Sequence, residues 1–338
     1  MIKQIIRLVR PYSFLPVFRL ELLQEGKVLV KPTVMSICAA DQRYFQGNRP
    51  KEVLARKLPM SLIHEALGEV IDDDSGVLKP GQQVIMLPGG REYNNAQSNY
   101  EKNAFFRSSN EDGFCQETLY LSHEELIVIP EREDTECYVF AELMSVCCHA
   151  IRRIAEIKQL SGAQRIGVWG DGAMGFMMAL VAKELYPDHH VTVFGKHEEK
   201  LMLFSFVDQI INILGDRGLP EVDVAFECVG GQGAVLAIEQ IIASIKSCGS
   251  TVLMGVSEVP PVINTRMILE KGLLFLGTSR SQRKDFETAK KLIDSPKIYG
   301  ALEKLISSRV NVHSYLDLHD AFVTDMQNPF RTVLHVSF

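Results

Sequence analysis

Three side chains near the start of the sequence have the chemistry of metal ligands. The segment MSICAAD (35–41) places Cys38 after a predicted strand, and LIHEALGEV (62–70) places His64 and Glu65 at the beginning of another. Thiolate, imidazole and carboxylate are ligand types that zinc takes, and a catalytic zinc site keeps one position open for water or substrate. Cys38 and His64 are 26 residues apart, which is not a local metal-binding motif. The spacing alone therefore leaves open the alternative of a buried core cysteine and a surface histidine.

A glycine motif in the middle of the chain has the chemistry of a dinucleotide site. Residues 165–169 (RIGVW) are a predicted strand, and GDGAMG (170–175) leads from this strand into a helical run. In that context Gly170 permits a tight turn, Gly172 lets the backbone approach a pyrophosphate, and Gly175 allows close packing of the helix on the strand. The free N–H groups at the helix N-terminus would then bind the pyrophosphate. The alternative is a structural glycine turn without a cofactor.

The end of the next predicted strand favours NADP over NAD. An NAD site carries Asp or Glu there, about 20 residues after the glycines, to bind the ribose 2′-hydroxyl. This chain instead has Gly195 and Lys196, with Lys200 one helical turn later. The small residue leaves room for a 2′-phosphate, and the lysines supply positive charge. The alternative is that both lysines are solvated surface charges.

The elements that must position these residues divide the chain into a β-rich part and an α/β part. Short predicted strands (28–35 and 65–71) characterise the first part, whereas strands alternate with helices after about residue 140. Such alternation is typical of a parallel sheet with crossover helices. We therefore expect an α/β protein with three segments. These are a β-rich catalytic domain (1–145), a doubly wound Rossmann domain (146–278), and a C-terminal return to the catalytic domain (279–338).

The composition excludes several classes of protein. The net charge is −6, from 36 basic and 42 acidic side chains, which argues against a nucleic-acid binder that works by bulk charge. No apolar stretch approaches the roughly 18 residues of a membrane span, and MIKQIIRLVRPY at the start lacks the features of a signal peptide. The 7 cysteines have no disulfide framework spacing, which indicates a reducing compartment. We expect a cytoplasmic protein without nucleic-acid or membrane partners.

The order of these motifs resembles the zinc-dependent medium-chain dehydrogenase/reductase family over nearly the whole chain. The matching segments are CAAD (38–41), HEALGEV (64–70), KPGQQV (79–84), AELMSVCCHA (141–150), GDGAMG (170–175) and FECVGG (226–231). The resemblance implies a GroES-like catalytic domain joined to the Rossmann domain, with a catalytic zinc ion bound by Cys38, His64 and Glu65. It also implies a further ligand, because Glu142 matches a glutamate that binds the zinc, directly or through water, in the polyol-dehydrogenase branch.

The sequence departs from this family at two places. Many members carry Ser or Thr two residues after the zinc cysteine as a proton relay, whereas this chain has Ala40. Many members also bind a structural zinc through four closely spaced cysteines in the lobe near residues 90–120, and this chain has only Cys115 there. We therefore expect one catalytic zinc, no structural zinc, and a proton route that does not use residue 40.

More narrowly, the sequence resembles the ribulose-5-phosphate reductases. The segments that carry this resemblance are MSICAADQRYF, LPMSLIHE, FRSSNEDGF, GVWGDG, FGK, AFECVGG and NTRMILEKGL. The resemblance implies NADPH-dependent, zinc-assisted reduction of D-ribulose 5-phosphate to D-ribitol 5-phosphate, which supplies CDP-ribitol for teichoic acid or capsule synthesis. Zinc would polarise the C2 ketone as a Lewis acid. The pathway makes a cytidylyltransferase a plausible partner, and the family implies a homo-oligomer.

The phosphate of such a substrate requires cationic ligands, and arginine suits phosphate through bidentate geometry. Arg43 follows the metal cysteine closely and Arg107 lies in the polar segment 89–114, so both are candidates. The alternative is that they are solvated surface charges. Two other functions remain open: a zinc-dependent polyol or alcohol dehydrogenase acting on an unphosphorylated substrate, and a non-catalytic NADPH-binding protein.

Overall fold

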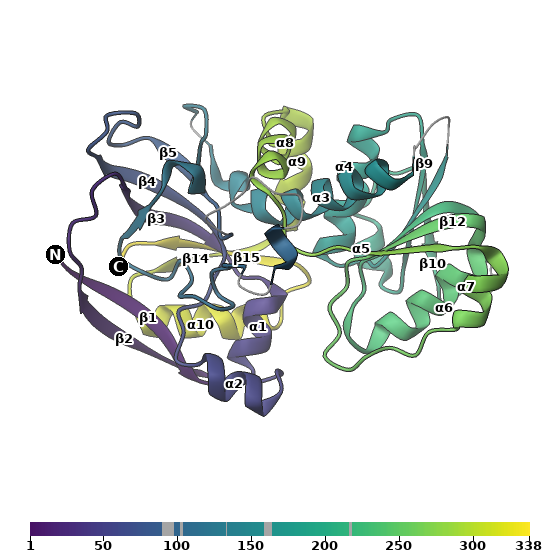
Figure 1. Ribbon diagram of the computed structural model, residues 1–338, viewed down its shortest axis with the longest axis horizontal. Coiled ribbons are helices and arrows are strands. Elements are labelled where there is room, and N and C mark those ends of the chain that lie inside the picture. The colour runs from purple at the N-terminus through teal and green to yellow at the C-terminus, as the bar shows by residue number, and fades with distance from the viewer. Residues whose placement is uncertain (90–97, 102–103, 133, 159–163, 216–217) are drawn as a thin grey trace. The chain divides into compact units, whose positions relative to one another are not determined.

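The protein has two compact units, each described here by itself (Figure 1). The computed structural model describes residues 1–89, 98–101, 104–132, 134–158, 164–215 and 218–338, so part of the polar segment 89–114 lies outside the described residues. The first unit comprises Met1–Glu142 and Ser281–Phe338, and the second comprises Leu143–Arg280. These boundaries lie within a few residues of the segment limits 145/146 and 278/279 derived from the sequence.

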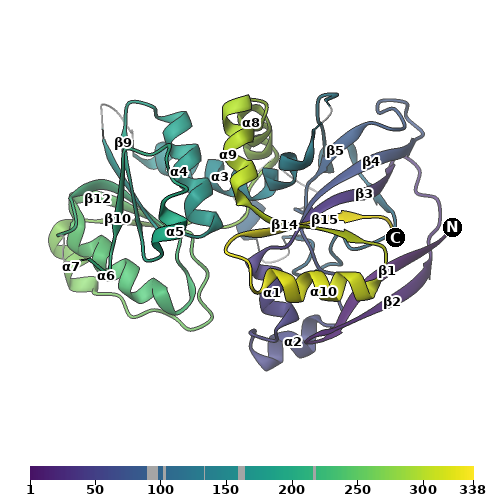
Figure 2. The same ribbon diagram turned by 180° about the vertical axis from the view of Figure 1, so that it is seen from behind.

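The described residues of the first unit form a seven-stranded sheet in which the order is β14-β15-β3-β4-β5-β7, with β6 paired to β3. Figure 2 shows the C-terminal strands β14 and β15 beside β3, so strands from both ends of the first unit's sequence form one sheet. The strands are β3 (Val28–Ser36), β4 (Glu65–Asp73), β5 (Gln83–Met86), β6 (Leu119–Leu121), β7 (Leu126–Val128), β14 (Ile306–Val312) and β15 (Arg331–Val336). The helices of this unit are α1 (Ala39–Phe45), α2 (Lys51–Lys57), α8 (Arg283–Ile293), α9 (Pro296–Leu302) and α10 (Tyr315–Asp325).

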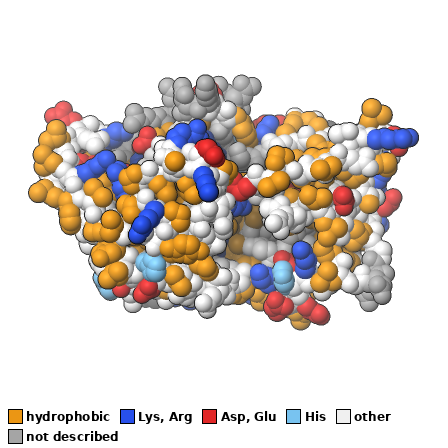
Figure 3. All heavy atoms as spheres, turned by 90° about the horizontal axis from the view of Figure 1, so that it is seen from below, with side chains coloured by type: hydrophobic (Ala, Val, Ile, Leu, Met, Phe, Trp, Pro, Cys, Tyr) orange, Lys and Arg blue, Asp and Glu red, His pale blue; other side chains and the backbone are white. Residues whose placement is uncertain are grey.

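An antiparallel hairpin, β1 (Ile2–Arg10) and β2 (Ser13–Leu20), lies beside this sheet as a separate two-stranded sheet. Alternate side chains of β1, such as Ile6 and Leu8, are fully buried. In contrast, Phe18 and Leu20 of β2 are 66% and 74% exposed. Figure 3 shows hydrophobic side chains on the surface of this unit. The hairpin therefore stabilises the unit through one strand and presents an apolar strand to solvent with the other.

A cluster of aromatic rings fixes the helix that follows the candidate metal cysteine. The Phe45 ring, at the end of α1, stacks on Phe14 at 5.6 Å and meets Phe322 of α10 at 4.9 Å between ring centroids. All three side chains are buried, and such aromatic contacts add to the stabilisation from burial alone. The core thus anchors α1 from its C-terminal end.

The described part of the second unit is a six-stranded parallel sheet in the order β10-β9-β8-β11-β12-β13, as the strand–helix alternation predicted. Helix α4 packs on β8 and β9, and α6 packs on β11 and β12. The strands are β8 (Arg165–Trp169), β9 (His190–Gly195), β10 (Gln209–Asn212), β11 (Val222–Glu227), β12 (Ile245–Leu253) and β13 (Leu274–Gly277). The helices are α3 (Ala141–Ile157), α4 (Ala173–Leu185), α5 (Glu198–Leu201), α6 (Ala234–Ser244) and α7 (Thr265–Lys271).

This strand order places the glycine motif where ligands bind in such sheets. The chain leaves β8 toward β9 on one side, and the later strands β11 to β13 extend on the other side. Open parallel sheets bind ligands at the carboxyl ends of the strands where the order reverses. The motif at residues 170–175 directly follows β8. Among the described residues, each helix is too short or too polar to cross a lipid bilayer.

Candidate metal and cofactor sites

The pairing of β3 with β4 brings the three predicted metal ligands together. Ser36 at the end of β3 pairs with Glu65 at the start of β4 in the antiparallel register. Cys38 follows β3 by two residues, and His64 immediately precedes β4. The ligand atoms of Cys38, His64 and Glu65 all lie within 4.8 Å of one another. The antiparallel register of β3 and β4 therefore brings together side chains that lie 26 residues apart in the sequence.

Asp41 is a buried carboxylate next to His64 of the ligand cluster. It is fully buried, and its Oδ1 accepts hydrogen bonds from the Ile63 N–H at 3.0 Å and the Ser108 hydroxyl at 2.5 Å. The same oxygen lies 3.4 Å from His64 Nδ1. Although burial opposes ionisation, His64 and these donors lower the pKa of Asp41. A carboxylate beside a ligating histidine favours one orientation of its ring, and here the two groups lie at ion-pair distance, outside hydrogen-bond geometry. The sequence reasoning missed this partner of His64.

Glu65 has an arginine partner that the sequence reasoning also missed. Its side chain is completely buried, and an Arg331 terminal nitrogen lies 3.1 Å from Glu65 Oε1, outside hydrogen-bond geometry. Arg331 also donates to the Ile37 carbonyl at 2.7 Å. Burial opposes its charge, but Glu65 and Cys38 raise the pKa of Arg331, so the guanidinium stays protonated. The first residue of β15 thereby balances negative charge at the ligand cluster.

Glu142 lies outside the compact cluster of Cys38, His64 and Glu65, although the charges of that cluster act on it. It is buried at the start of α3. Burial, reinforced by the carboxylate of Glu65, raises the pKa of Glu142 to about 7, while His64 acts in the opposite direction. Burial opposes the protonated form of His64, but Asp41 and Cys38 raise its pKa. The assignment of Glu142 as a fourth zinc ligand stays a prediction.

The residues present fit a zinc ion. A thiol, an imidazole and a carboxylate converge, and among the described residues both oxygens of the buried Glu65 carboxylate lack a hydrogen-bond donor. Buried carboxylates without donors are costly, and a cation relieves that cost. The donor set matches zinc, which binds sulfur, nitrogen and oxygen ligands in open catalytic sites. Cys115 is buried with its Sγ 3.9 Å from Met35 Sδ.

The two candidate phosphate ligands occupy different environments. Arg43 lies in the last turn of α1, whose N-cap is Cys38. The Arg107 side chain is only 13% exposed, and its guanidinium lies 3.4 Å from Glu125 and over the ring of Phe114. Both assignments stay predictions, although an arginine already paired with a carboxylate offers fewer donors to a phosphate.

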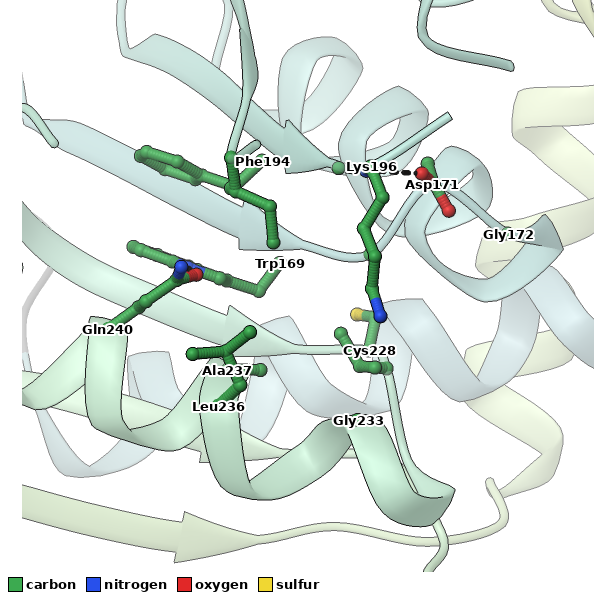
Figure 4. Close-up of a pocket in the computed structure, with 14 residues that line it drawn as sticks. Trp169, Asp171, Gly172, Phe194, Lys196, Cys228, Gly233, Leu236, Ala237 and Gln240 are labelled. Atoms are coloured by element: carbon green, nitrogen blue, oxygen red, sulfur yellow. Dashed lines mark hydrogen bonds between the residues drawn. The ribbon is translucent and has the colours of Figure 1, made fainter. Parts of the chain in front are cut away.

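The glycine motif lines a cavity of about 180 Å³ in the second unit (Figure 4). This volume is smaller than that of typical sites for whole ligands, so it suits one part of a dinucleotide. Trp169 and Phe194 stack at 3.9 Å between ring centroids on one side of the cavity. The other lining residues come from the ends of β8, β9 and β11 and from α6 and its approach; they include Gly170, Asp171, Gly172, Gly195, Lys196, Cys228, Gly233, Ala237 and Gln240.

The three motif glycines are used differently by the backbone. Gly170 has a φ of +129°, which favours glycine. A Cβ on Gly175 would lie 1.9 Å from the Gly170 carbonyl oxygen, whereas a Cβ on Gly172 would meet no atom within 4 Å. Gly175 is thus required for packing, and Gly172 leaves the open space that a bound group could enter. Lys196 lines the same cavity, and Lys200 lies on α5 outside its lining.

A β-rich unit with a Cys–His–Glu cluster, combined with a Rossmann unit, defines a zinc-dependent medium-chain dehydrogenase/reductase. Comparison with known proteins agrees, since residues 24–131 match the alcohol dehydrogenase GroES-like domain. The chain is 42% identical to ribulose-5-phosphate reductase 1 of Staphylococcus aureus and 41% identical to the ribulose-5-phosphate reductase of Bacillus spizizenii, with 99% of each chain covered in both cases. The crystal structure of S. aureus TarJ in complex with NADPH superimposes with a TM-score of 0.88 at 39% identity, over 100% of both chains. The chain belongs to the ribulose-5-phosphate reductase family.

Proposed function

We propose that the protein reduces D-ribulose 5-phosphate to D-ribitol 5-phosphate with NADPH as the hydride donor. The observation that carries the proposal is the convergent Cys38–His64–Glu65 cluster in a chain whose full-length relatives are named ribulose-5-phosphate reductases. The Gly195–Lys196 pair, which lines the cofactor cavity in the second unit, supports NADPH over NADH.

The chain's own residues have distinct tasks in this reaction. Cys38, His64 and Glu65 hold the metal, with Glu142 as a further ligand. Asp41 orients the His64 ring, and Arg331 offsets the negative charge of Glu65. When bound, zinc supplies Lewis-acid polarisation of the substrate ketone and NADPH supplies the hydride. Ala40 has no hydroxyl, so the proton for the product hydroxyl comes from water, from a neighbouring carboxylate or along the substrate's own hydroxyls.

Recognition of the substrate phosphate falls to Arg43 and Arg107 in this proposal. The decisive experiment follows NADPH oxidation with ribulose 5-phosphate and with ribulose. Because a site that binds a phosphate through charge-assisted hydrogen bonds cannot make those bonds with an unphosphorylated sugar, we expect kcat/KM to be about a hundredfold or more higher for the phosphorylated ketose. Equal rates would instead indicate a polyol dehydrogenase acting on unphosphorylated sugars. NADPH binding without any turnover would indicate a non-catalytic protein.

The metal content gives an independent test, in which we expect one zinc per chain and no structural zinc. Element analysis of protein purified without added metal should give about one zinc per chain. Cys115→Ser should retain that zinc, because this thiol lies against Met35 rather than in the ligand cluster. Chelation should abolish NADPH oxidation, and added zinc should restore it. A content near two, or activity that survives complete zinc removal, would contradict the assignment.

The proposal extends to the product and its users. Ribitol 5-phosphate supplies CDP-ribitol for teichoic acid or capsule synthesis in the cytoplasm, and the enzyme that consumes it is a cytidylyltransferase. We propose that this enzyme is a partner and that the chain forms a homo-oligomer, and the exposed apolar strand β2 supports an association of some kind. Light scattering of the protein alone and with the cytidylyltransferase tests both statements.

A further inference from the structure

Asp171, the variable residue between the first two glycines of the motif, binds the turn that follows the next strand. Its Oδ2 accepts hydrogen bonds from the backbone N–H of Lys196 at 2.6 Å and of His197 at 2.8 Å. The His197 ring nitrogen Nδ1 also lies 3.0 Å from this oxygen. Figure 4 shows the bond between the Asp171 side chain and Lys196. One carboxylate oxygen therefore ties the end of β9 to the glycine loop after β8.

The same carboxylate explains why residue 195 is glycine. A Cβ on Gly195 would lie 2.7 Å from the Asp171 Cβ and 2.8 Å from its Oδ2. An acidic side chain at the end of β9, the position that binds the ribose 2′-hydroxyl in NAD sites, would collide with Asp171. The carboxylate near the end of β9 is thus that of Asp171 in the glycine loop, and its Oδ2 accepts hydrogen bonds from the backbone of the turn after β9.

These hydrogen bonds stabilise the ionised carboxylate of Asp171. Burial disfavours the ionised form, but the backbone N–H groups of His197 and Lys196 and the His197 ring lower the pKa of Asp171. Charge-assisted hydrogen bonds of this kind hold a turn firmly. With its backbone fixed, Lys196 extends its side chain along the cavity toward Cys228 (Figure 4). The ammonium group thus faces the cavity while the carboxylate faces the turn.

We propose that Asp171 is a positioning residue for the 2′-phosphate of NADPH, which acts by fixing the Gly195–His197 turn so that Lys196 projects over the cavity. This inference rests on the proposed use of NADPH. In this role Asp171 acts through the position of Lys196 and not through a bond of its own to the phosphate or the ribose. A carboxylate that itself accepted a hydrogen bond from the ribose 2′-hydroxyl would have the opposite effect, because it would favour NADH.

The test measures binding of adenosine 2′,5′-bisphosphate and of 5′-AMP to the full-length protein by calorimetry, without turnover. We expect Asp171→Ala to weaken the bisphosphate about tenfold while changing the 5′-AMP affinity less than about twofold, because a lost charge-assisted bond is worth this much. Asp171→Asn, whose amide oxygen can still accept from the turn, should restore part of the loss. Asp188→Ala removes an exposed charge from the same unit and should change neither affinity.

A double-mutant cycle separates positioning from general loosening of the fold. Lys196→Ala should weaken the bisphosphate to a similar degree, and the double variant should be little worse than either single variant, because both act through the same ammonium group. Tighter bisphosphate binding by Asp171→Ala, equal weakening of both ligands, or additive losses would each overturn the inference. If the wild type itself binds both ligands equally, the NADPH assignment fails and this inference fails with it. If the wild type prefers the bisphosphate and Asp171→Ala keeps that preference, only this inference fails.

Discussion

Replacing Cys38 with serine should lower kcat for NADPH oxidation by about a thousandfold or more and remove the bound zinc. Cys38 supplies the one sulfur atom in the cluster with His64 and Glu65. Zinc binds cysteine as a thiolate, for which a serine hydroxyl is a poor substitute. Rates with ribulose 5-phosphate, zinc content by element analysis and NADPH affinity by fluorescence titration should be measured together. The NADPH affinity should stay within about twofold, because Cys38 belongs to the first unit and the cofactor cavity to the second.

The Cys38→Ser protein should remain folded. Cys38 stands at the N-cap of α1, and serine is among the preferred residues there. Far-UV circular dichroism and the thermal midpoint should therefore match the wild type with zinc removed. Cys248→Ser changes an exposed thiol of the second unit and should keep both zinc and activity. Full activity in the Cys38 variant would show that the ligand cluster is not the catalytic site.

Local sequence patterns predicted the elements that carry the ligands. The predicted strand at 28–35 is β3 (Val28–Ser36), the strand at 65–71 is β4 (Glu65–Asp73), and the strand at 165–169 is β8. Each of these segments has strand composition along its own length, so it can be recognised without knowledge of its neighbours. The first strand of the chain, β1, was not predicted, and neither was the short strand β10. Strand β10 has only four residues, of which one is buried, so it leaves little pattern to detect.

The supporting residues of both sites could not be derived in the same way. Arg331 reaches Glu65 because β15 pairs with β3 and β3 with β4, and this register is a property of the sheet rather than of any local segment. Asp171 reaches the turn after β9 only because β8 and β9 are parallel neighbours. The end of β9 itself carries Gly195, and the carboxylate comes instead from the loop after β8, which no pattern within β9 indicates. Ligand types can be read from a sequence, but their partners depend on nonlocal pairing.

Two glycines of one motif should separate cofactor binding from stability, and Gly172→Ala is the more informative change. Gly172 has extended backbone angles that alanine adopts freely, and its added Cβ would meet no atom within 4 Å. Because Gly172 is the N-cap of α4, where alanine is less favoured than glycine, the thermal midpoint without cofactor should fall by only about 1–2 °C. The methyl group would, however, enter the space through which a pyrophosphate approaches the backbone. We expect the Kd for NADPH to rise by about tenfold to a hundredfold, measured by fluorescence titration.

Gly175→Ala is the matched variant in which the same added methyl group acts on the fold. Its Cβ would lie 1.9 Å from the Gly170 carbonyl oxygen, so α4 must move away from the loop after β8. Overpacking of this kind costs about 1–3 kcal/mol or more, so the thermal midpoint should fall by several degrees even without cofactor. Unchanged NADPH affinity in Gly172→Ala would contradict a pyrophosphate site at this loop. A similar loss of stability in both variants would show that Gly172 is also required for packing. That result would contradict the assignment of the open space beside Gly172 to a bound group.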